Sequence, residues 1–224
     1  DIGLWVVADG MGGHSRGNVA SKAICDALGR ITPKSSLSGS LDLIEDTLSR
    51  VNQELLNLAQ QSETPGTIGS TVLVLIAVDS HAVLIWAGDS RAYRLRGQQL
   101  QQLTDDHSQV ADLIAAGDLD PADAESHPAA NVITRAVGGA HSLKVDVDLI
   151  ELHNGDRLLL CSDGMYRELS PEELTDVLAT SKTTAEATAT LVDRTLATSA
   201  RDNLSVVVID FYDISTRPMS ASSE

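Results

Sequence analysis

Runs of aliphatic residues constrain the fold of this chain more than any other feature. They span residues 4–8, 72–78, 82–87, 158–161 and 206–209. Each run is short, rich in valine, isoleucine, leucine or alanine, and bounded by Asp, Gly or Ser, which is typical of strands buried on both faces. Shorter strand candidates are 92–96, 99–103 and 144–150, and in the last Val145, Val147 and Leu149 alternate with polar residues.

Turn residues between these runs indicate how the strands are joined. Asp79-Ser80 lies between two runs, and Gly97-Gln98 lies between two of the shorter candidates. Both pairs favour tight hairpins, so we expect largely antiparallel sheets.

Helices should pack outside these sheets. One apolar stripe has the helical spacing 3, 4, 3, 4, 3 and consists of Leu41, Ile44, Leu48, Val51, Leu55 and Leu58. A second stripe runs from Ala20 to Ile31, after Gly17. Ser170-Pro171 predicts the start of a third helix, with Ser as the N-cap. A fourth helix is indicated by Ala185, Ala189, Val192 and Leu196. Together the elements predict an α+β fold with helices outside a pair of sheets.

The composition limits which kinds of partner this chain can bind. The 16 basic and 32 acidic residues give a formal net charge of −16, which disfavours nucleic acid and anionic membrane. No apolar run approaches the roughly 18 residues of a membrane span. We interpret Cys25 and Cys161 as reduced core residues and expect a cytoplasmic location. The 224 residues suit one domain at 1–212, followed by a Ser-rich flexible tail at 213–224.

Asp9, Asp163 and Asp202 share one context. Each lies at the end of an aliphatic strand and beside a turn-forming residue. If neighbouring strands carry them to one edge, the carboxylates repel one another and need a cation. Oxygen ligands select hard ions such as Mg²⁺ or Mn²⁺, and Gly10 allows its carbonyl to approach an ion closely. A single Asp-Gly pair is ordinarily only a turn, but three such aspartates favour a metal site.

Short motifs strengthen this interpretation. The sequence from Asp9 to His14, DGMGGH, resembles the signature of the bacterial metal-dependent protein phosphatases of type 2C, the PPM family. Further segments resemble family motifs in the family's order: Gly69-Ser70-Thr71, Gly88-Asp89-Ser90-Arg91-Ala92-Tyr93, Thr104-Asp105-Asp106-His107-Ser108, Ile133-Thr134-Arg135-Ala136-Val137-Gly138, Ser162-Asp163-Gly164 and Arg201-Asp202-Asn203-Leu204-Ser205. The resemblance covers residues 4–212.

The resemblance implies a four-layer α-β-β-α sandwich, with two mainly antiparallel central sheets flanked by helix pairs. It also implies two bound Mg²⁺ or Mn²⁺ ions at one end of the sheets. Asp9 would bridge both ions, the Gly10 carbonyl would bind one of them, and Asp163 and Asp202 would complete the other. A third, weaker metal would be held by Asp106 together with Asp163.

The implied activity is hydrolysis of phosphoserine and phosphothreonine by a metal-activated water. Asp9 would serve catalysis through the metals, and His14 or a metal-bound water would protonate the leaving oxygen. We expect a monomer whose substrates are phosphorylated targets of a bacterial Ser/Thr kinase. Two alternatives stay open: a non-catalytic regulatory module with this fold, and a metal-dependent hydrolase of another phosphoester.

The chain departs from the family's pattern at two places. Members carry an R-x-x-N-E-D segment upstream of the first motif, whose Arg holds the phosphate and whose acids serve the metals. The sequence begins eight residues before Asp9 without that segment, so we expect activity to depend on it. Animal members read D-G-H where this chain has Met11.

Several residues of the motifs have plainer interpretations. We expect Asp89 and Arg91 to pair and brace a turn, and His107 to support the loop of Asp106. Arg135 is either a structural ion partner or a peptide contact. Residues 117–128 contain acids and prolines, and we expect an exposed flap there that selects substrates.

Overall fold

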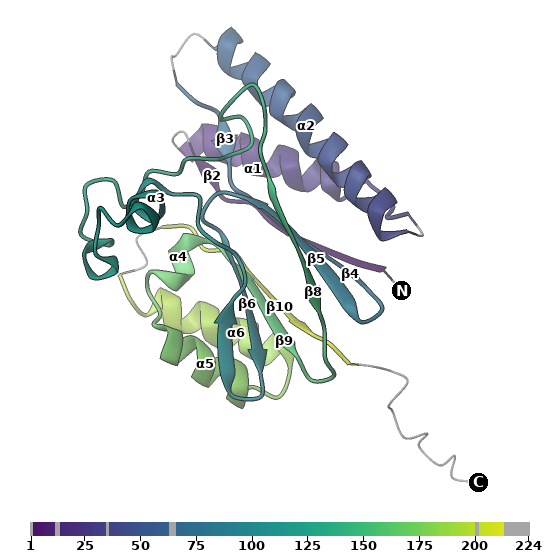
Figure 1. Ribbon diagram of the computed structural model, residues 1–224, viewed down its shortest axis with the longest axis vertical. Coiled ribbons are helices and arrows are strands. Elements are labelled where there is room, and N and C mark those ends of the chain that lie inside the picture. The colour runs from purple at the N-terminus through teal and green to yellow at the C-terminus, as the bar shows by residue number, and fades with distance from the viewer. Residues whose placement is uncertain (1, 12–13, 35, 63–65, 200–201, 213–224) are drawn as a thin grey trace.

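The computed structural model describes residues 2–11, 14–34, 36–62, 66–199 and 202–212. Two four-stranded sheets lie between two layers of helices, which confirms the predicted four-layer sandwich (Figure 1). The strand orders are β1-β4-β5-β8 and β10-β9-β6-β7, and every pair in both sheets is antiparallel. The predicted tail at 213–224 lies outside the described residues.

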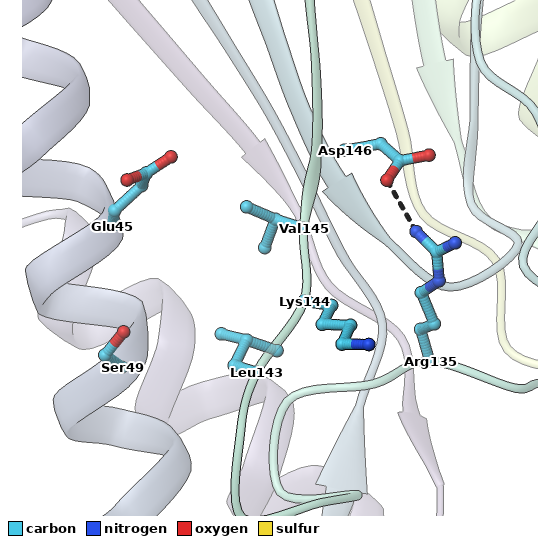
Figure 2. A pocket seen from close by; sticks show the side chains of 7 residues that line it. All are labelled: Glu45, Ser49, Arg135, Leu143, Lys144, Val145 and Asp146. Atoms are coloured by element: carbon cyan, nitrogen blue, oxygen red, sulfur yellow. Dashed lines mark hydrogen bonds and ion pairs between the residues drawn. The ribbon is translucent and has the colours of Figure 1, made fainter.

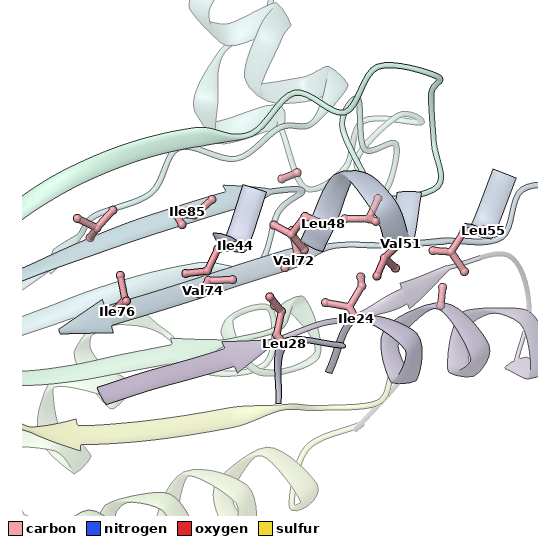
Figure 3. Packing of buried hydrophobic residues seen from close by; sticks show 14 of the residues in the cluster. Ile24, Leu28, Ile44, Leu48, Val51, Leu55, Val72, Val74, Ile76 and Ile85 are labelled. Atoms are coloured by element: carbon pink, nitrogen blue, oxygen red, sulfur yellow. The ribbon is translucent and has the colours of Figure 1, made fainter. Parts of the chain in front are cut away.

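The first sheet consists of β1 (Ile2–Val7), β4 (Val72–Val78), β5 (His81–Ala87) and β8 (Asp146–Glu151). Helices α1 (His14–Leu28) and α2 (Leu37–Gln61) cover its outer face. In β4, Val72, Val74 and Ile76 pack against these helices, as Figure 3 shows, whereas Leu73 and Leu75 pack between the sheets. Both faces of the strand are therefore buried, as the aliphatic run predicts.

The second sheet consists of β6 (Arg91–Arg96), β7 (Gln99–Gln102), β9 (Arg157–Cys161) and β10 (Val206–Asp210). Helices α5 (Pro171–Thr180) and α6 (Thr184–Leu196) cover it. Ser170 and Glu173 form a capping box at the start of α5, so the predicted helix start is confirmed. Both predicted hairpins are present, and Asp79 adopts a φ of 53° in the first.

The predicted fourth helix is confirmed as α6, but the apolar residues that indicated it do not form its buried face. Ala187, Leu191 and Thr195 face the core, whereas Ala185, Ala189 and Leu196 are exposed. In this alanine-rich segment both sets of residues have helical spacing, so the sequence pattern alone does not show which set faces the core. The core can accept Thr195 because its Oγ1 donates a hydrogen bond to the Leu191 carbonyl at 2.8 Å.

Two further predictions of burial are wrong. Val147 and Leu149 of β8 are exposed, although they pair with Ile85 and Val83, which do pack against the helices. Because β8 is the edge strand, its outer face extends beyond the cover that the helix pair provides. Cys25 is exposed on α1, whereas Cys161 is buried as predicted.

The segment between β7 and β8 contains a helix that the sequence analysis missed. This helix, α3 (Gln109–Ala116), begins at the N-cap Ser108 and ends at Gly117, whose φ is 79°. None of its residues is buried, and with eight residues its apolar stripe of Val110, Leu113 and Ile114 is short. Residues 117–128 are largely exposed, as predicted, and include the short 3-10 helix η1 (Pro121–Asp123). Within the described residues no helix is both long and apolar enough to cross a membrane.

The start of α1 packs backbone to backbone against β2 (Gly10–Met11), which pairs with β3 (Gly69–Ser70). A Cβ atom on Gly17 would lie 2.4 Å from the carbonyl oxygen of Gly10, and one on Gly10 would lie 1.9 Å from that of Gly17. Only glycine at both positions allows this approach.

We expect Gly17→Ala to lower the free energy of unfolding by about 1–3 kcal/mol, because the added methyl must push α1 away from β2. Urea denaturation measures the change, with Asn18→Ala as the control at an exposed position on the same helix. Equal stability of the two variants would show that the glycine contact contributes nothing.

Candidate metal and phosphate site

Asp9 follows β1 and is held by the Gly69-Ser70-Thr71 motif. Its N–H donates to Thr71 Oγ1 at 2.9 Å, and its carbonyl accepts from the Thr71 N–H at 2.8 Å and from Ser70 Oγ at 2.9 Å. Thr71 and Ser70 are buried. The backbone of Asp9 is therefore fixed by the adjacent start of β4.

The turn from Gly88 to Ser90 carries the chain from the first sheet to the second. Gly88 has a φ of 118°, and a Cβ atom there would lie 2.6 Å from the side chain of Thr71. The hydroxyls of Thr71 and Ser90 lie 2.8 Å apart in a buried hydrogen bond. These contacts bring Asp89 to the same end of the sandwich as Asp9.

Asp163 and Asp202 reach this end from the second sheet. Asp163 follows β9 and begins the short helix α4 (Asp163–Tyr166). A Cβ atom on Gly164 would lie 2.3 Å from the carbonyl oxygen of Asn203, so the segment after Asp202 lies directly against α4. Ser162 fixes that segment, because its Oγ accepts from the Ser205 N–H at 2.9 Å.

The structure thus brings together the three aspartates that the strand ends indicated, and it adds Asp89. We call Asp9, Asp89, Asp163 and Asp202 the acid cluster. Burial raises the pKa of Asp9 to about 7, helped by the charge of Asp163, a hydrogen bond with it, and the charges of Asp202 and Asp89. Burial and the charges of Asp163 and Asp106 raise the pKa of Asp89 to about 6.

Asp106, predicted to hold a third metal with Asp163, is bound by an arginine. Arg91 Nε lies 2.9 and 3.2 Å from its two oxygens, and Nη2 lies 2.8 Å from Oδ2. The guanidinium of Arg91 also lies 3.7 Å from the centre of the Tyr166 ring. The predicted pair of Asp89 with Arg91 is therefore wrong, because Arg91 pairs with Asp106 and the arginine beside Asp89 is Arg167.

Within the described part of the chain, Arg167 is a cation that lies beside the acid cluster, a position that no motif of the sequence predicts. Its Nε lies 3.2 Å from Asp163 Oδ2, and its Nη2 lies 3.6 Å from Asp89 Oδ2. It also donates to the Asn131 side chain and, at 3.3 Å, to the Ala130 carbonyl. The only signal in the sequence was its spacing of four residues from Asp163 on α4.

His107 is buried beneath the turn that carries Asp89. Its Nδ1 accepts from the Gly88 N–H at 3.2 Å, and its ring stacks on Trp86. Its Nε2 lies 3.1 Å from Asp146, and Arg135 lies 2.5 Å from the same carboxylate. Burial opposes ionisation of Asp146, but the hydrogen bonds from His107 and Arg135 lower its pKa. Arg135 is thus a structural ion partner.

A hollow of about 430 Å³ lies beside this ion pair, between α2 and the chain entering β8. Figure 2 shows Arg135 joined to Asp146 at one side of it, with Leu143 and Val145 between that pair and α2. None of its lining residues belongs to the acid cluster. The four carboxyl groups of the acid cluster therefore lie outside this hollow.

The donors of the acid cluster suit a hard divalent cation. They are carboxylate oxygens on a buried framework, and a cation would offset the repulsion that raises the pKa of Asp9. Gly10 lies in β2 directly after Asp9. Across the described ranges, no three acidic, histidine or cysteine side chains already have the spacing of a formed metal site. His14 is the first residue of α1, and its side chain lies outside the described part, so its role stays a prediction.

Comparison with known proteins agrees with this geometry. Residues 2–205 match the family model described as protein phosphatase 2C. The serine/threonine phosphatase stp of Listeria monocytogenes is 31% identical over 221 residues, covering 97% of this chain and 87% of that protein.

Two solved structures have the same fold. PppA, described as a key regulatory component of T6SS in Pseudomonas aeruginosa, is 39% identical with a TM-score of 0.83, covering 93% of this chain and 86% of that one. The catalytic domain of the serine threonine protein phosphatase PstP, in complex with 2 manganese ions, is 31% identical with a TM-score of 0.82, covering 94% and 88%.

The raised pKa of Asp9 gives a prediction for the protein in EDTA. A carboxyl group with a raised folded-state pKa binds its proton more tightly in the folded state, so it costs stability above pH 4 and increasingly up to about pH 7. We expect Asp9→Asn to raise the free energy of unfolding at pH 8, on the order of 2–4 kcal/mol, because about 1.4 kcal/mol accompanies each pKa unit.

Urea denaturation in EDTA at pH 4.5 and pH 8 checks this prediction. The gain from Asp9→Asn should be much smaller at pH 4.5, where the carboxyl group of Asp9 is protonated. Asp176→Asn, at an exposed ion pair on α5, serves as the control. A loss of stability from Asp9→Asn at pH 8 would contradict the predicted repulsion.

Proposed function

From the premise that this chain belongs to the protein phosphatase 2C family and is a protein serine/threonine phosphatase, we propose that it hydrolyses phosphoserine and phosphothreonine with a water activated by two divalent cations. The observation that carries the proposal is the convergence of Asp9, Asp163, Asp202 and Asp89, whose mutual repulsion together with burial raises the pKa of Asp9 to about 7. Such an arrangement costs free energy at neutral pH unless cations offset the charge.

Asp9, Asp163, Asp202 and the carbonyl of Gly10 would hold the ions, which we propose to be Mg²⁺ or Mn²⁺. When bound, the ions would lower the pKa of a water molecule toward neutrality and offset charge on the phosphoryl oxygens. Asp9 is held in position for this chemistry because its backbone makes three hydrogen bonds with Ser70 and Thr71. His14, at the start of α1, is the proposed proton donor to the leaving oxygen.

The proposed substrates are phosphorylated proteins, targets of a bacterial Ser/Thr kinase, and the proposed setting is a cytoplasmic monomer. The net charge of −16 disfavours polyanionic substrates, which supports a phosphoprotein over a nucleic-acid diester. The exposed residues after α3, at 117–128, are proposed to contact the protein on either side of the phosphorylated residue.

The test is hydrolysis of p-nitrophenyl phosphate and of a phosphothreonine peptide in Mn²⁺, Mg²⁺ or EDTA. Because family members carry an R-x-x-N-E-D segment upstream, the assay includes the 224-residue chain and a form extended by such a segment. We expect Mn²⁺-dependent release that Asp163→Asn lowers by at least about 100-fold, as for loss of an electrostatic contribution to catalysis.

Asp176→Asn, on the exposed surface of α5, is the matched control and should keep the wild-type rate. Metal-dependent stabilisation without turnover in either form would favour a regulatory module instead. A preference for bis-p-nitrophenyl phosphate over the monoester would favour a phosphodiesterase.

A further inference from the structure

Arg167 occupies a distinctive place among the ion pairs of this protein. Its guanidinium lies 3.2 Å from Asp163 and 3.6 Å from Asp89, two members of the acid cluster that come from different connections of the fold. Its side chain is 33% exposed, and those of Asp163 and Asp89 are 18% and 12% exposed. The pairs are thus largely shielded from water, which makes the charge of Arg167 more effective than at an open surface.

We propose that Arg167 is the protein's own cation in the acid cluster, bridging Asp163 and Asp89 where a third metal ion would otherwise bind. The inference rests on the proposed function, because it concerns the site that holds the two catalytic ions. It implies that the chain binds two Mn²⁺ ions and no third.

A second arginine occupies Asp106, the other carboxylate that could hold a further ion. Arg91 binds both oxygens of Asp106, and it is held in turn by the ring of Tyr166. A metal ion that binds Asp106, or the Asp89 oxygen next to Arg167, would have to compete with a guanidinium. Since bidentate arginine–carboxylate pairs are among the strongest charge-assisted hydrogen bonds, Asp106 is the less available of the two.

The remaining donors of Arg167 explain why its guanidinium stays in place. They bind the Asn131 side chain and the Ala130 carbonyl, in the segment that follows η1. A planar guanidinium can satisfy carboxylates and a carbonyl in different directions at once, which the ammonium group of lysine does less well. Arg167 therefore also connects the acid cluster to the segment between α3 and β8.

The test counts Mn²⁺ ions by isothermal titration calorimetry, and by electron paramagnetic resonance of the free ion, on the full chain. We expect two ions per chain in the wild type and three in Arg167→Gln, because the variant frees Asp89 and Asp163 oxygens without adding charge. Arg167→Lys keeps a positive charge, so it should stay at two. Arg194→Gln on α6, which removes an exposed pair with Asp176 of α5, is the control and should also stay at two.

A double variant links the extra ion to its proposed ligand. Arg167→Gln with Asp89→Asn should return to two ions, whereas Arg167→Gln with Asp176→Asn should keep three. If Arg167→Gln folds poorly without metal, saturating Mn²⁺ should restore its midpoint of thermal unfolding toward that of the wild type. A merely structural arginine would give a loss that Mn²⁺ does not recover.

The outcomes separate the two proposals. Three ions in the wild type, or two in Arg167→Gln, would overturn the role of Arg167 while leaving the phosphatase mechanism in place. No Mn²⁺ binding by the wild type, either as the 224-residue chain or as the form extended by the upstream segment, would instead contradict the proposed function, and with it the inference.

Discussion

Repulsion among carboxylates at one end of the sandwich is the constraint around which this structure is arranged. The register of the strands determines where they meet: Val7 pairs with Leu73, Val72 with Ala87, and Arg91 and Val206 both pair with Cys161. The four connections that leave these strand ends carry Asp9, Asp89, Asp163 and Asp202. Antiparallel sheets can place such residues together only if all the connections lie at the same end, and here they do.

The repulsion among these carboxylates affects the surrounding side chains in different ways. Burial and the charges of Asp163, Asp202 and Asp89 all raise the pKa of Asp9. Three other acids each have an arginine partner. Arg91 binds Asp106, Arg135 binds Asp146 and Arg167 binds Asp163. Asp9, by contrast, is left with the repulsion of the acids beside it, which favours its protonated form. A divalent cation would relieve that repulsion, and this is what would favour cation binding beside Asp9.

The motifs allowed part of the site to be predicted. They did not indicate Asp89 or Arg167, because the places of these two residues depend on how the two sheets and α4 come together. Asp9, Asp163 and Asp202 stand out because each follows or precedes an aliphatic strand. Asp89 has the same context, but its place in the cluster depends on the turn that crosses between the sheets, which no local pattern reveals. Arg167 is missed for a related reason, since its partners are defined only after α4 lies against the turn of Asp89.

Predictions of burial succeeded in the central strands and failed at the edge strand β8 and in α6, where competing helix faces are alike. The unbroken run of valines and leucines in β4 predicted a strand with both faces buried, and both faces are buried. In α6, alanines give little difference in burial between competing faces, and Thr195 could enter the core because it bonds its own helix. In α3 no residue is buried, so capping by Ser108 and Gly117, rather than packing, marks its ends.

The separation of Asp9 and Asp163 is therefore a property of the whole sandwich. Asp9 is fixed to the first sheet through Thr71, whereas Asp163 continues directly from β9 of the second. The layer of side chains between the sheets, which includes Leu73 and Leu160, sets how far apart the two carboxylates lie. Interiors are close-packed, so a change of volume in that layer shifts one sheet against the other. Substitutions far from the acid cluster can thus alter cation binding by changing the spacing of its two halves, without touching any ligand.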